Sequence, residues 1–517
     1  MRFLFDFAAY RRRPISRAES CARIAERLRA RQALFLHKLK KDVFDNGSSP
    51  YLALMRHARC EYGDLEDGVT RDGIEPTLRL LMRNGVYLKS GEFKGREPLE
   101  RGRLRVAAGP DRLRSPQSAY QLTIFSSGSR GEPTPVLMDL RFVRDCGGAW
   151  QLLLEAWGEN GWRIADWETP GAGARFRLMK YIGAGKSADA WFSQVDPDGD
   201  GTPGIVRWNT RMLRWAGRLT GNPIPMPVHT PLQNPQPILD WFARTVREKR
   251  IPLAQTFASS AVALCRMALE KGIDISGGRL LVMGEPITRS RVETIRKAQC
   301  VPIPRYGSIE TGPIGYGCPM GRHPDDVHLM ADHHAVIQAG DDGPAGLPPE
   351  ALLVTSLHPN SPFTMLNLSM GDQGVIEEAR CGCLLESVGW TTHLRDIRSF
   401  EKLTSCGVTF LGTEVIQVLE EVLPKRFGGA PTDFQLVENE MEDGRAVLTL
   451  VVNPSLGALD DRVIADEFLS AISAGSAVGA VNAQIWRDGG TVRIERRFPT
   501  VGRSGKILHF STAQKQE

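Results

Sequence analysis

The sequence predicts an α/β protein, with a large N-terminal domain of sheets and helices followed by a small α+β unit. The chain has 517 residues, which is longer than the roughly 250–300 residues that one hydrophobic core supports. Through the middle of the chain, apolar runs alternate with amphipathic helical patterns, as is typical of α/β sheets. After about residue 400 the pattern changes to a helix, a strand pair and a second helix. These observations indicate two or more domains.

The composition excludes several classes of protein. Hydrophobic residues make up 42% of the chain and charged residues 24%, so ordinary cores can be buried. No run of about 18 apolar residues occurs, which argues against a membrane-spanning helix. The 65 basic and 60 acidic residues give a net charge of only +5, and this balance argues against nucleic acid as the main partner.

The first residues, MRFLFDFAAYRRRPISR, place their arginines after a short apolar patch. A secretory signal has the reverse order, with a basic start and a small-residue cleavage site. We therefore expect a cytoplasmic protein. In that compartment its nine cysteines should be free, metal-bound or catalytic rather than paired in a disulfide framework.

Several segments of the middle region have sequence patterns that predict buried strands or helices. The stretches AYQLTIFSSG, RLLVMGEP and ALLVTSL each predict a buried strand that runs into a loop. The stretches SAVALCRMALEKG and ITRSRVETIRKAQ predict helices between them. In such a sheet, ligand sites are expected at the carboxyl ends of the strands.

The tail predicts a separate α+β unit. The stretch FLGTEVIQVLEEVLP has the pattern of an amphipathic helix, and DRVIADEFLSAISAG that of a second helix. Between them, DFQLVENEMEDGRAVLTLVVNP predicts a strand pair around a turn at Asp443 and Gly444. We place the domain boundary near Phe400.

Two short motifs are similar to known ligand-binding loops, but each lacks a residue that the loop requires. Gly185, Lys186 and Ser187 imitate a P-loop, but Lys180 stands where that motif requires its first glycine. DPDGDG, from residue 196, imitates a calcium loop, but its twelfth position is Arg207 instead of a bidentate glutamate. Both are expected to be surface turns.

Five further segments occur in a consistent order. The first, SSGSRGEPT at 126–134, would on its own indicate only a turn, because Ser, Gly and Pro clusters usually do. The others follow it at defined places: MGEPI at 283–287, PRYGSIETG at 304–312, SMGDQG at 369–374 and RSGKI at 503–507.

Together these segments resemble the adenylate-forming superfamily of acyl-CoA synthetases, luciferases and peptide-synthetase adenylation domains. Within it, the sequence is most similar to the phenylacetate–CoA ligase and acyl-protein synthetase group. The resemblance implies an N-terminal domain, 1–398, that binds ATP and an acid, contains a β-barrel-like part and begins with a variable helical part at 1–105. It also implies a mobile C-terminal lid domain, 399–517, with a hinge near Phe400 and Glu401.

The resemblance also implies which residues bind the nucleotide. The loop at 126–134 would wrap the β- and γ-phosphates of ATP, and its glycines would permit close backbone approach. Tyr306 and Gly307 would lie at adenine, with the tyrosine ring stacked on the base, and Asp372 would accept hydrogen bonds from the ribose hydroxyls. The remaining residues implied are Ser126, Ser127, Gly128, Ser129, Arg130, Gly131 and Thr134 in the loop, and Gly284, Glu285 and Pro286 in the turn beside the base.

Three charged residues would serve the chemistry. Glu310 would hold Mg²⁺, a hard cation that prefers oxygen ligands. Arg398 would meet the ribose or the α-phosphate. Lys506 would reach in from the C-terminal domain and stabilise charge on the carboxylate and the α-phosphate as the bond to pyrophosphate breaks.

The sequence departs from the superfamily pattern at several positions. Arg130 and Ile309 stand where Ser or Thr is usual, and Ser308 or Thr311 would have to replace the second missing hydroxyl. The stretch FTMLNLSM before Asp372 lacks the usual arginine and tyrosine, and Ile397 replaces a glycine. These departures lie at positions expected to contact the nucleotide, so they affect the prediction of activity more than the prediction of fold.

The implied activity is an ATP-dependent ligase that adenylates a small-molecule carboxylic acid, releases pyrophosphate and passes the acyl group to a thiol. The acceptor is coenzyme A, or else an acyl carrier protein or a protein cysteine. A catalytically impaired nucleotide-binding pseudoenzyme is the alternative of another class. The small apolar stretch at 257–263, with Met283, favours an aromatic or aliphatic acid over a charged one.

The protein is expected to be a monomer or a homodimer.

The cysteines predict a metal site. Cys318 and His328 lie in one segment, and Cys381 and Cys383 in a later Cys-x-Cys pair. Three thiolates and an imidazole would form a closed tetrahedral zinc site, which would be structural because no position is left for water. The phenylacetate–CoA ligase group is similar here, and it favours His328 over His323. The alternative is three buried thiols and a surface histidine.

Overall fold

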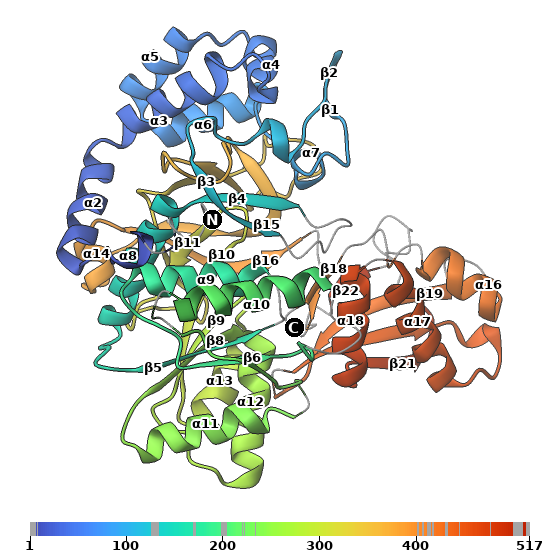
Figure 1. Cartoon of the computed structure of the whole chain (residues 1–517). Helices are drawn as coiled ribbons and strands as arrows, with labels where there is room; N and C mark the ends of the chain where they lie inside the picture. Colours follow the sequence, from blue (N-terminus) through green and yellow to red (C-terminus); the bar gives the residue numbers. More distant parts are fainter. Residues whose placement is uncertain are drawn as a thin grey trace.

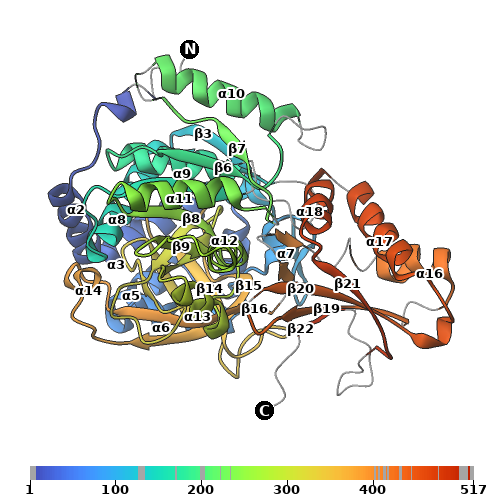
Figure 2. The ribbon, with the colours of Figure 1, turned by 90° about the horizontal axis from the view of Figure 1, so that it is seen from below.

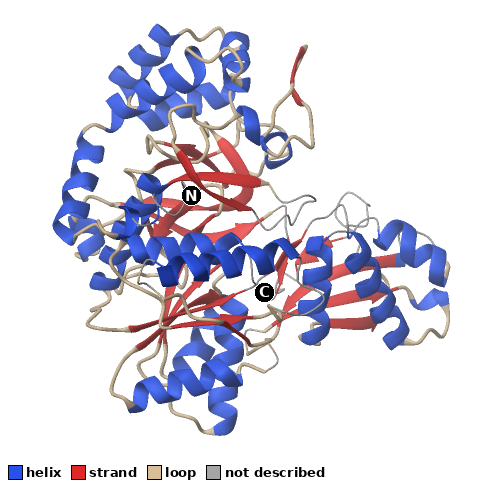
Figure 3. Ribbon diagram, viewed as in Figure 1, coloured by secondary structure: helices blue, strands red, loops and turns tan. Residues whose placement is uncertain are grey.

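The computed structural model shows three parts along the chain: N-terminal helices, a central sheet with helices on its faces, and a C-terminal unit at one side (Figure 1). Figure 3 shows the same arrangement, with blue helices around the red strands. The structure describes residues 7, 9–125, 134–168, 172–197, 204–219, 221, 223–232, 234–400, 403–405, 408–410, 415, 418–429, 433–443, 445–475, 477–499 and 510–512.

Short helices form the N-terminal part. Their apolar faces pack onto the antiparallel strands of the central sheet, so that Leu78 and Phe93 share one buried cluster with Leu353 and Phe363. This packing makes the helices part of the main core. Their bounds are α2 Arg17–Arg29, α3 Arg31–Leu39, η1 Lys40–Phe44 (a π-helix), α4 Pro50–His57, α5 Tyr62–Asp72, α6 Ile74–Arg83 and α7 Ser90–Phe93.

A buried ion network fixes α2 to the rest of the molecule. Asp145 accepts hydrogen bonds from Arg23 at 2.9 Å, from Arg27 at 2.8 Å and from His358 Nε2 at 3.0 Å. Arg27 also pairs with Asp332 at 2.8 Å. The hydrogen bond from His358 and the two guanidinium charges outweigh the effect of burial, and they lower the pKa of Asp145 to about 2.

The centre of the fold is one mixed twelve-stranded sheet in the order β13-β14-β15-β16-β12-β11-β10-β9-β8-β5-β6-β7. The strands from β10 to β7 are parallel, and those from β13 to β11 pair antiparallel. Strand β10 joins the two halves. The bounds are β5 Arg163–Glu168, β6 Ala190–Ser193, β7 Pro227–His229, β8 Pro252–Phe257, β9 Arg279–Met283, β10 Val301–Ser308, β11 Gly312–Tyr316, β12 Val327–Leu329, β13 His334–Gln338, β14 Ala351–Ser356, β15 Leu368–Glu378 and β16 Thr392–Ser399.

Helices cover both faces of the parallel half. The helices α8, Leu140–Ala156, and α9, Ala172–Gly183, share a buried cluster with one face, whereas α11 to α13 share another with the opposite face. Figure 2 shows these layers from below, with α10 on the outside. The remaining bounds are α10 Gly204–Leu219, α11 Gln236–Arg247, α12 Ala258–Lys271, α13 Arg289–Lys297 and α14 Leu384–Ser387, with the strand pairs β1 Leu99–Arg101, β2 Leu104–Val106 and β3 Tyr120–Phe125, β4 Pro135–Asp139.

The fold class predicted from the sequence is confirmed, because the protein is mixed α/β with a smaller C-terminal unit. The strands predicted in the middle region are β3, β9 and β14, and the two predicted helices are α12 and α13. The resemblance also implied a β-barrel-like part, without assigning strands to it, and the described antiparallel strands β11 to β16 belong to the large sheet. The boundary at residue 398 stays a prediction.

The C-terminal unit has its own four-stranded sheet, in the order β21-β20-β19-β22. The predicted strand pair is confirmed, since Glu440 pairs with Ala446 across the turn. The helix predicted at 410–424 is described only in part, as a π-helix from residue 418 onward. The bounds are β17 Leu403–Ser405, β18 Val408–Phe410, η3 Val418–Val422, α16 Leu423–Phe427, β19 Phe434–Glu440, β20 Ala446–Val452, α17 Asp461–Gly475, α18 Ala477–Asp488, β21 Val492–Arg496 and β22 Phe510–Thr512.

The C-terminal unit contacts the parallel half of the large sheet. Val195, which follows β6, is buried in the core of the C-terminal unit. The turn residue Asp443 accepts a hydrogen bond from the Thr294 hydroxyl at its backbone carbonyl, at 2.9 Å, and its carboxylate pairs with Arg266 at 3.2 Å. These contacts connect the predicted turn to helices α12 and α13.

The first imitation motif, at Gly185, forms a turn. Gly185 has φ +70°, as expected in the turn after α9, and Lys186 pairs with Glu159 at 2.8 Å. Most of DPDGDG lies outside the described residues. None of the helices that the structure describes is long and apolar enough to span a bilayer.

Candidate functional site

The strand order places a switch point in the parallel half of the sheet. From β5 the chain moves outward to β6 and β7, and it then returns to the other side of β5 to form β8, β9 and β10. The order therefore reverses between β5 and β8, whose last residues are Glu168 and Phe257. Ligands of open α/β sheets bind in the crevice at such a point, outside the carboxyl ends of the strands.

Tyr306 and Asp372, both predicted at the nucleotide site, lie in contact. The Tyr306 hydroxyl donates a hydrogen bond to Asp372 Oδ2 at 3.1 Å. Burial and the neighbouring carboxylate raise the pKa of Tyr306 well above its usual value, so the hydroxyl stays protonated and can donate. The bond joins β10 to β15, and hence the parallel half of the sheet to the antiparallel half.

Two predicted glycines occupy positions that require glycine. Gly307 has φ +148°, and a Cβ there would collide with the backbone carbonyl of Gly312. Gly284 has φ +75°, and a Cβ there would lie 2.9 Å from the ring of Phe257. Both positions therefore depend on the absence of a side chain.

The turn between β10 and β11 uses its own hydroxyl groups. Thr311 N donates to Ser308 Oγ at 3.1 Å, Ser308 N donates to Thr311 Oγ1 at 3.0 Å, and the Thr311 hydroxyl donates to the Gly312 carbonyl at 2.8 Å. Ile309, which stands where a hydroxyl is usual, packs against the main buried cluster. The partly buried side chain at 309 therefore packs at the edge of the core.

Glu310 has a cationic neighbour that the sequence did not reveal. Lys94 Nζ lies 3.4 Å from Glu310 Oε1, and both side chains are almost completely buried. Lys94 follows α7, a segment held to the sheet by the pairing of Leu88 with Leu368. No local signal marks Lys94, because the contact depends on how the N-terminal helices pack on the sheet. The N-terminal part thus contributes a charge to the predicted Mg²⁺ site.

Glu285 is held by protein groups. Its carboxylate accepts hydrogen bonds from Ser259 N and Ser259 Oγ, both at 2.8 Å, and from Arg291 at 3.0 Å. These bonds fix the Gly284-Glu285-Pro286 turn to the start of α12. The carboxylate therefore organises the turn beside Tyr306.

The remaining predicted site residues differ in their exposure, and several lie outside the described residues. Arg398 lies on β16 opposite Gln373, and its side chain is 56% exposed, with Asp396 at 3.5 Å. Thr134 is buried next to the start of β4. The residues Ser126, Ser127, Gly128, Ser129, Arg130, Gly131 and Lys506 lie outside the described residues.

The four predicted metal ligands come together. The ligand atoms of Cys318, His328, Cys381 and Cys383 all lie within 4.8 Å of one another. His328 Nε2 is 3.3 Å from Cys383 Sγ and 3.5 Å from Cys381 Sγ. His323, the alternative weighed from the sequence, does not belong to this group. Three sulfurs and one imidazole nitrogen are the donor set of a tetrahedral zinc site.

The surroundings of the cluster orient its ligands. His328 Nδ1 lies 2.6 Å from the Trp390 carbonyl, so Nδ1 carries the proton and Nε2 is directed at the sulfurs. The Glu386 carboxylate accepts the backbone N–H groups of Cys381 and Gly382, at 2.7 and 2.6 Å. The Cys318 thiol and His328 lower the pKa of Cys383 to about 3, which favours the thiolate that binds metals.

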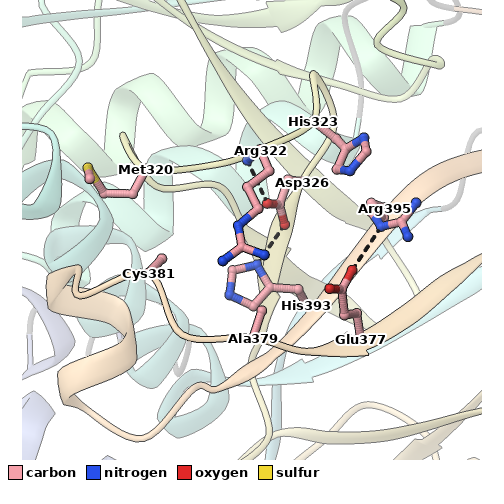
Figure 4. Close-up of a pocket in the computed structure, with 9 residues that line it drawn as sticks. All are labelled: Met320, Arg322, His323, Asp326, Glu377, Ala379, Cys381, His393 and Arg395. Carbon is pink, nitrogen blue, oxygen red and sulfur yellow. Dashed lines mark hydrogen bonds and ion pairs between the residues drawn. The ribbon is translucent and has the colours of Figure 1, made fainter.

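A small pocket lies beside the cluster (Figure 4), and Cys381 is part of its wall. Inside it, Asp326 joins two neighbours, since its carboxylate accepts the Arg322 N–H at 3.0 Å and lies 2.7 Å from His393 Nδ1. The ring centroids of His393 and His328 are 4.0 Å apart. The pocket wall therefore supports the imidazole of the cluster.

Comparisons with known proteins give matches in structure only. No known family matches the sequence, and no curated protein matches it. Among solved structures, 2-hydroxyisobutyryl-CoA ligase, in complex with 2-HIB-AMP and CoA in the thioesterification state, is 15% identical. That match covers 98% of this chain and 92% of the ligase, with a TM-score of 0.56. The K483A mutant of the amide bond synthetase McbA from Marinactinospora thermotolerans is 14% identical, over 94% of this chain and 97% of that one, with a TM-score of 0.42.

The first of these matches extends over almost the whole chain and includes the large sheet, the N-terminal helices and the C-terminal unit. It agrees with the resemblance carried by the five sequence segments. The chain therefore has the fold of the adenylate-forming enzymes.

Proposed function

We propose that this protein activates a carboxylic acid with ATP and transfers the acyl group to a thiol, for which coenzyme A is the leading acceptor. In the first half-reaction a carboxylate oxygen attacks the α-phosphorus of ATP and pyrophosphate leaves, which gives an acyl-AMP. In the second, the thiol loses its proton, its sulfur attacks the acyl carbon and AMP leaves. The mixed anhydride replaces one difficult displacement by two easier ones, because AMP is a far better leaving group than oxide.

The observation that carries the proposal is the contact between Tyr306 and Asp372, with Glu310 in the following turn. It supports an adenosine site in which the tyrosine ring stacks on the base and Asp372 accepts the ribose hydroxyls. In this proposal Glu310 would hold the Mg²⁺ that accompanies the ATP phosphates. All three side chains lie at or beside the carboxyl end of β10, where the fold class binds ligands.

The outer residues would complete the reaction. The loop at 126–134 would cradle the terminal phosphates, and Lys506 would stabilise the charge that develops between the carboxylate and the α-phosphate. Arg398, which is half exposed beside the end of the large sheet, is suited to meet the ribose or the α-phosphate. In this proposal the C-terminal domain moves between the two half-reactions, because the lysine must leave before the thiol enters.

The cysteine cluster would hold zinc through Cys318, His328, Cys381 and Cys383. With four protein ligands, no position remains for water or substrate, so the zinc would stabilise the fold rather than act in catalysis. It would tie β12 to the segment before β16, and hence support the antiparallel half that carries Asp372.

The decisive experiment is ATP–pyrophosphate exchange with the purified protein across a panel of aryl, aliphatic and fatty acids. We expect exchange with at least one acid and its loss in Lys506→Ala. ATP binding by calorimetry without exchange for any acid would instead favour a nucleotide-binding pseudoenzyme. A thioester assay with coenzyme A and with an acyl carrier protein, run on the acid that works, then separates the acceptors.

A further inference from the structure

A buried polar cluster lies on one face of the parallel sheet, at the switch point. Strands β5, β8, β9 and β10 direct polar or sulfur-containing side chains toward helix α9. Most of these residues are almost completely buried, although the interior of a sheet is normally apolar. The cluster comprises Asp166 and Glu168 from β5, Gln255 from β8, Met283 from β9, Arg305 from β10, and Arg177, Lys180 and Tyr181 from α9.

Part of the cluster is internally paired. Arg177 bonds to Asp166 at 2.9 Å and to Glu168 at 2.7 Å, and the Tyr181 hydroxyl donates to Asp166 at 2.9 Å. The guanidinium of Arg177 is therefore paired with two carboxylates, and this arrangement is stable in a folded core without a ligand.

Arg305 is not paired in this way. It is 9% exposed, and among the described residues no carboxylate lies within ion-pair distance of its guanidinium. Within the described residues, its Nη1 donates to the Met283 sulfur at 2.6 Å, the uncharged Tyr316 hydroxyl is a close neighbour, and its Nε is buried without a partner. Since buried charges are normally paired, a buried guanidinium that faces a thioether lacks its proper acceptor.

Other donors and acceptors around Arg305 are incompletely satisfied too. The amide of Gln255 donates to the same Met283 sulfur at 3.4 Å. Lys180 donates to the neutral Gln255 carbonyl at 3.2 Å and lies over the rings of Trp150 and Tyr181, and burial and Arg305 lower the pKa of this lysine well below its usual value. Glu168 Oε1 has no hydrogen-bond partner among the described residues. Two donors thus converge on one weak acceptor, the Met283 sulfur.

The position of the cluster connects it to the reaction. Arg305 precedes Tyr306 on β10, and Met283 ends β9 immediately before the Gly284 turn. Met283 is also one of the residues expected to line the acid pocket. A methionine side chain is flexible and can move aside for a ligand at small cost.

We propose that Arg305 binds a second anionic group on the acid substrate, and that the Met283 sulfur occupies the place of that group while no acid is bound. The substrate class is therefore acids that carry two anionic groups, such as dicarboxylic acids. This inference rests on the proposed function, and it replaces the expectation of a purely apolar acid that the stretch at 257–263 suggested. Arg305 acts on specificity and takes no part in the transfer of the acyl group.

The test compares acids of matched length with and without a second carboxylate. The pairs are glutarate with pentanoate, adipate with hexanoate, and terephthalate with 4-methylbenzoate, each assayed by ATP–pyrophosphate exchange. The wild type should show at least about tenfold higher kcat/KM for one or more diacids, because an ionic hydrogen bond in a buried site favours the partner that can make it. Arg305→Met should lower kcat/KM for that diacid about tenfold or more and change the matched monoacid less than about threefold.

Two controls separate binding from folding. Arg279→Met removes another arginine from the neighbouring strand, at its opposite end, where the guanidinium lies over the Trp162 ring, and it should leave the acid preference unchanged. Without acid, Arg305→Met should keep or raise the thermal midpoint, since it removes a buried cation that has no carboxylate partner. A clear fall in that midpoint would overturn the proposal, because it would identify Arg305 as a structural residue.

The failure of this inference differs from the failure of the proposed function. Exchange with monoacids at rates equal to or above those with diacids, or an equal loss of both in Arg305→Met, would overturn the inference alone. If no acid supports exchange, the proposed function fails. The inference is then judged by whether adipate or terephthalate raises the thermal midpoint of the wild type but not of Arg305→Met, and the absence of any such rise overturns it.

Discussion

The hydroxyl of Tyr306, on β10, donates a hydrogen bond of 3.1 Å to the carboxylate of Asp372, on β15. Four strands lie between β10 and β15 in the chain order, and three, β16, β12 and β11, lie between them in the sheet, so the contact depends on the complete fold. Both residues are ones that the ordered sequence segments predict at the adenosine site. Their contact fixes the direction of the tyrosine hydroxyl, and in the proposed function the same carboxylate would also accept a ribose hydroxyl.

Removal of the Asp372 charge should weaken nucleotide binding. In Asp372→Asn, we expect the apparent Kd for ATP to rise about tenfold or more, because hydrogen bonds to a charged acceptor contribute about 1.5–3 kcal/mol. Tyr306→Phe should have a smaller effect in the same direction. Isothermal titration with ATP checks both, and Tyr87→Phe, a tyrosine that lies against Arg101 in the N-terminal part, serves as the control. Unchanged ATP binding in Asp372→Asn would contradict the assignment.

Replacement of Lys94, the cation beside Glu310, should change the stability of the protein and its stabilisation by MgATP. In Lys94→Ala, a buried carboxylate loses its cation at 3.4 Å, and we expect the free energy of unfolding to fall by about 3 kcal/mol. If Glu310 holds Mg²⁺ beside the phosphates, MgATP should raise the thermal midpoint of this variant more than that of the wild type. Lys89→Ala, which removes a partly buried lysine of the same segment that donates to the Ala345 carbonyl, is the matched control. Equal shifts in variant and wild type would mean that the pair is structural only.

The cysteine cluster should contain zinc. Purified protein is expected to bind about one equivalent of zinc, and Cys383→Ser should lower this to less than about a tenth and reduce the thermal midpoint, since ligand binding contributes to folding. Cys60→Ser alters a cysteine outside the cluster and should change neither value. Elemental analysis together with thermal unfolding, before and after chelation, measures both. Wild-type protein that lacks zinc and is insensitive to chelation would exclude the site.

Gly307 should not tolerate a side chain. With φ +148° and the Gly312 carbonyl in the place of a Cβ, Gly307→Ala must distort the turn that carries Ser308 and Glu310. We expect a loss of at least about 1–3 kcal/mol in the free energy of unfolding and weaker ATP binding. Gly47→Ala, at a glycine with open space around it, should have little effect. Wild-type stability in Gly307→Ala would show that the turn adapts.

The Asp145 network predicts a loss of stability at acid pH. The pKa of Asp145 is lowered to about 2 in the folded protein, against about 3.9 in an unfolded chain. Its contribution, about 2–3 kcal/mol, is therefore complete above about pH 4 and is lost as the pH falls toward 2. Burial lowers the pKa of His358, so folding also disfavours its protonation below about pH 6.5. Both effects destabilise the protein in acid.

Urea unfolding between pH 7 and pH 3 tests this network. Asp145→Asn should be less stable than the wild type at pH 7, and its disadvantage should become smaller as the pH falls below about 4. Asp72→Asn, an exposed carboxylate beside Arg71, should follow the wild type throughout. A disadvantage that stays constant over the whole range would mean that the Asp145 charge does not contribute as described.

Apolar periodicity and residue spacing in the sequence predicted the helices and strands. They could not predict contacts between segments that are distant in the sequence. Strands β9 and β14 and helices α12 and α13 were predictable because their apolar periodicity is strong. The three cysteines of the metal cluster were predictable because few residue types bind zinc, whereas the choice of His328 over His323 came from the resemblance to the phenylacetate–CoA ligase group. Lys94 and Arg305 were not, since a lysine or an arginine in the sequence carries no sign of burial. The preference for an aromatic or aliphatic acid, inferred from the stretch at 257–263, stays a prediction.

One further consequence follows from β10, which pairs in parallel with β9 on one side and antiparallel with β11 on the other. The two halves of the large sheet therefore share a strand and cannot be separated into fragments that fold alone. A fragment that ends before β11 would expose the edge of β10, which is a template for aggregation. A split reporter or a two-part expression of this chain should instead be divided after β16, where the strands of the large sheet end at Ser399.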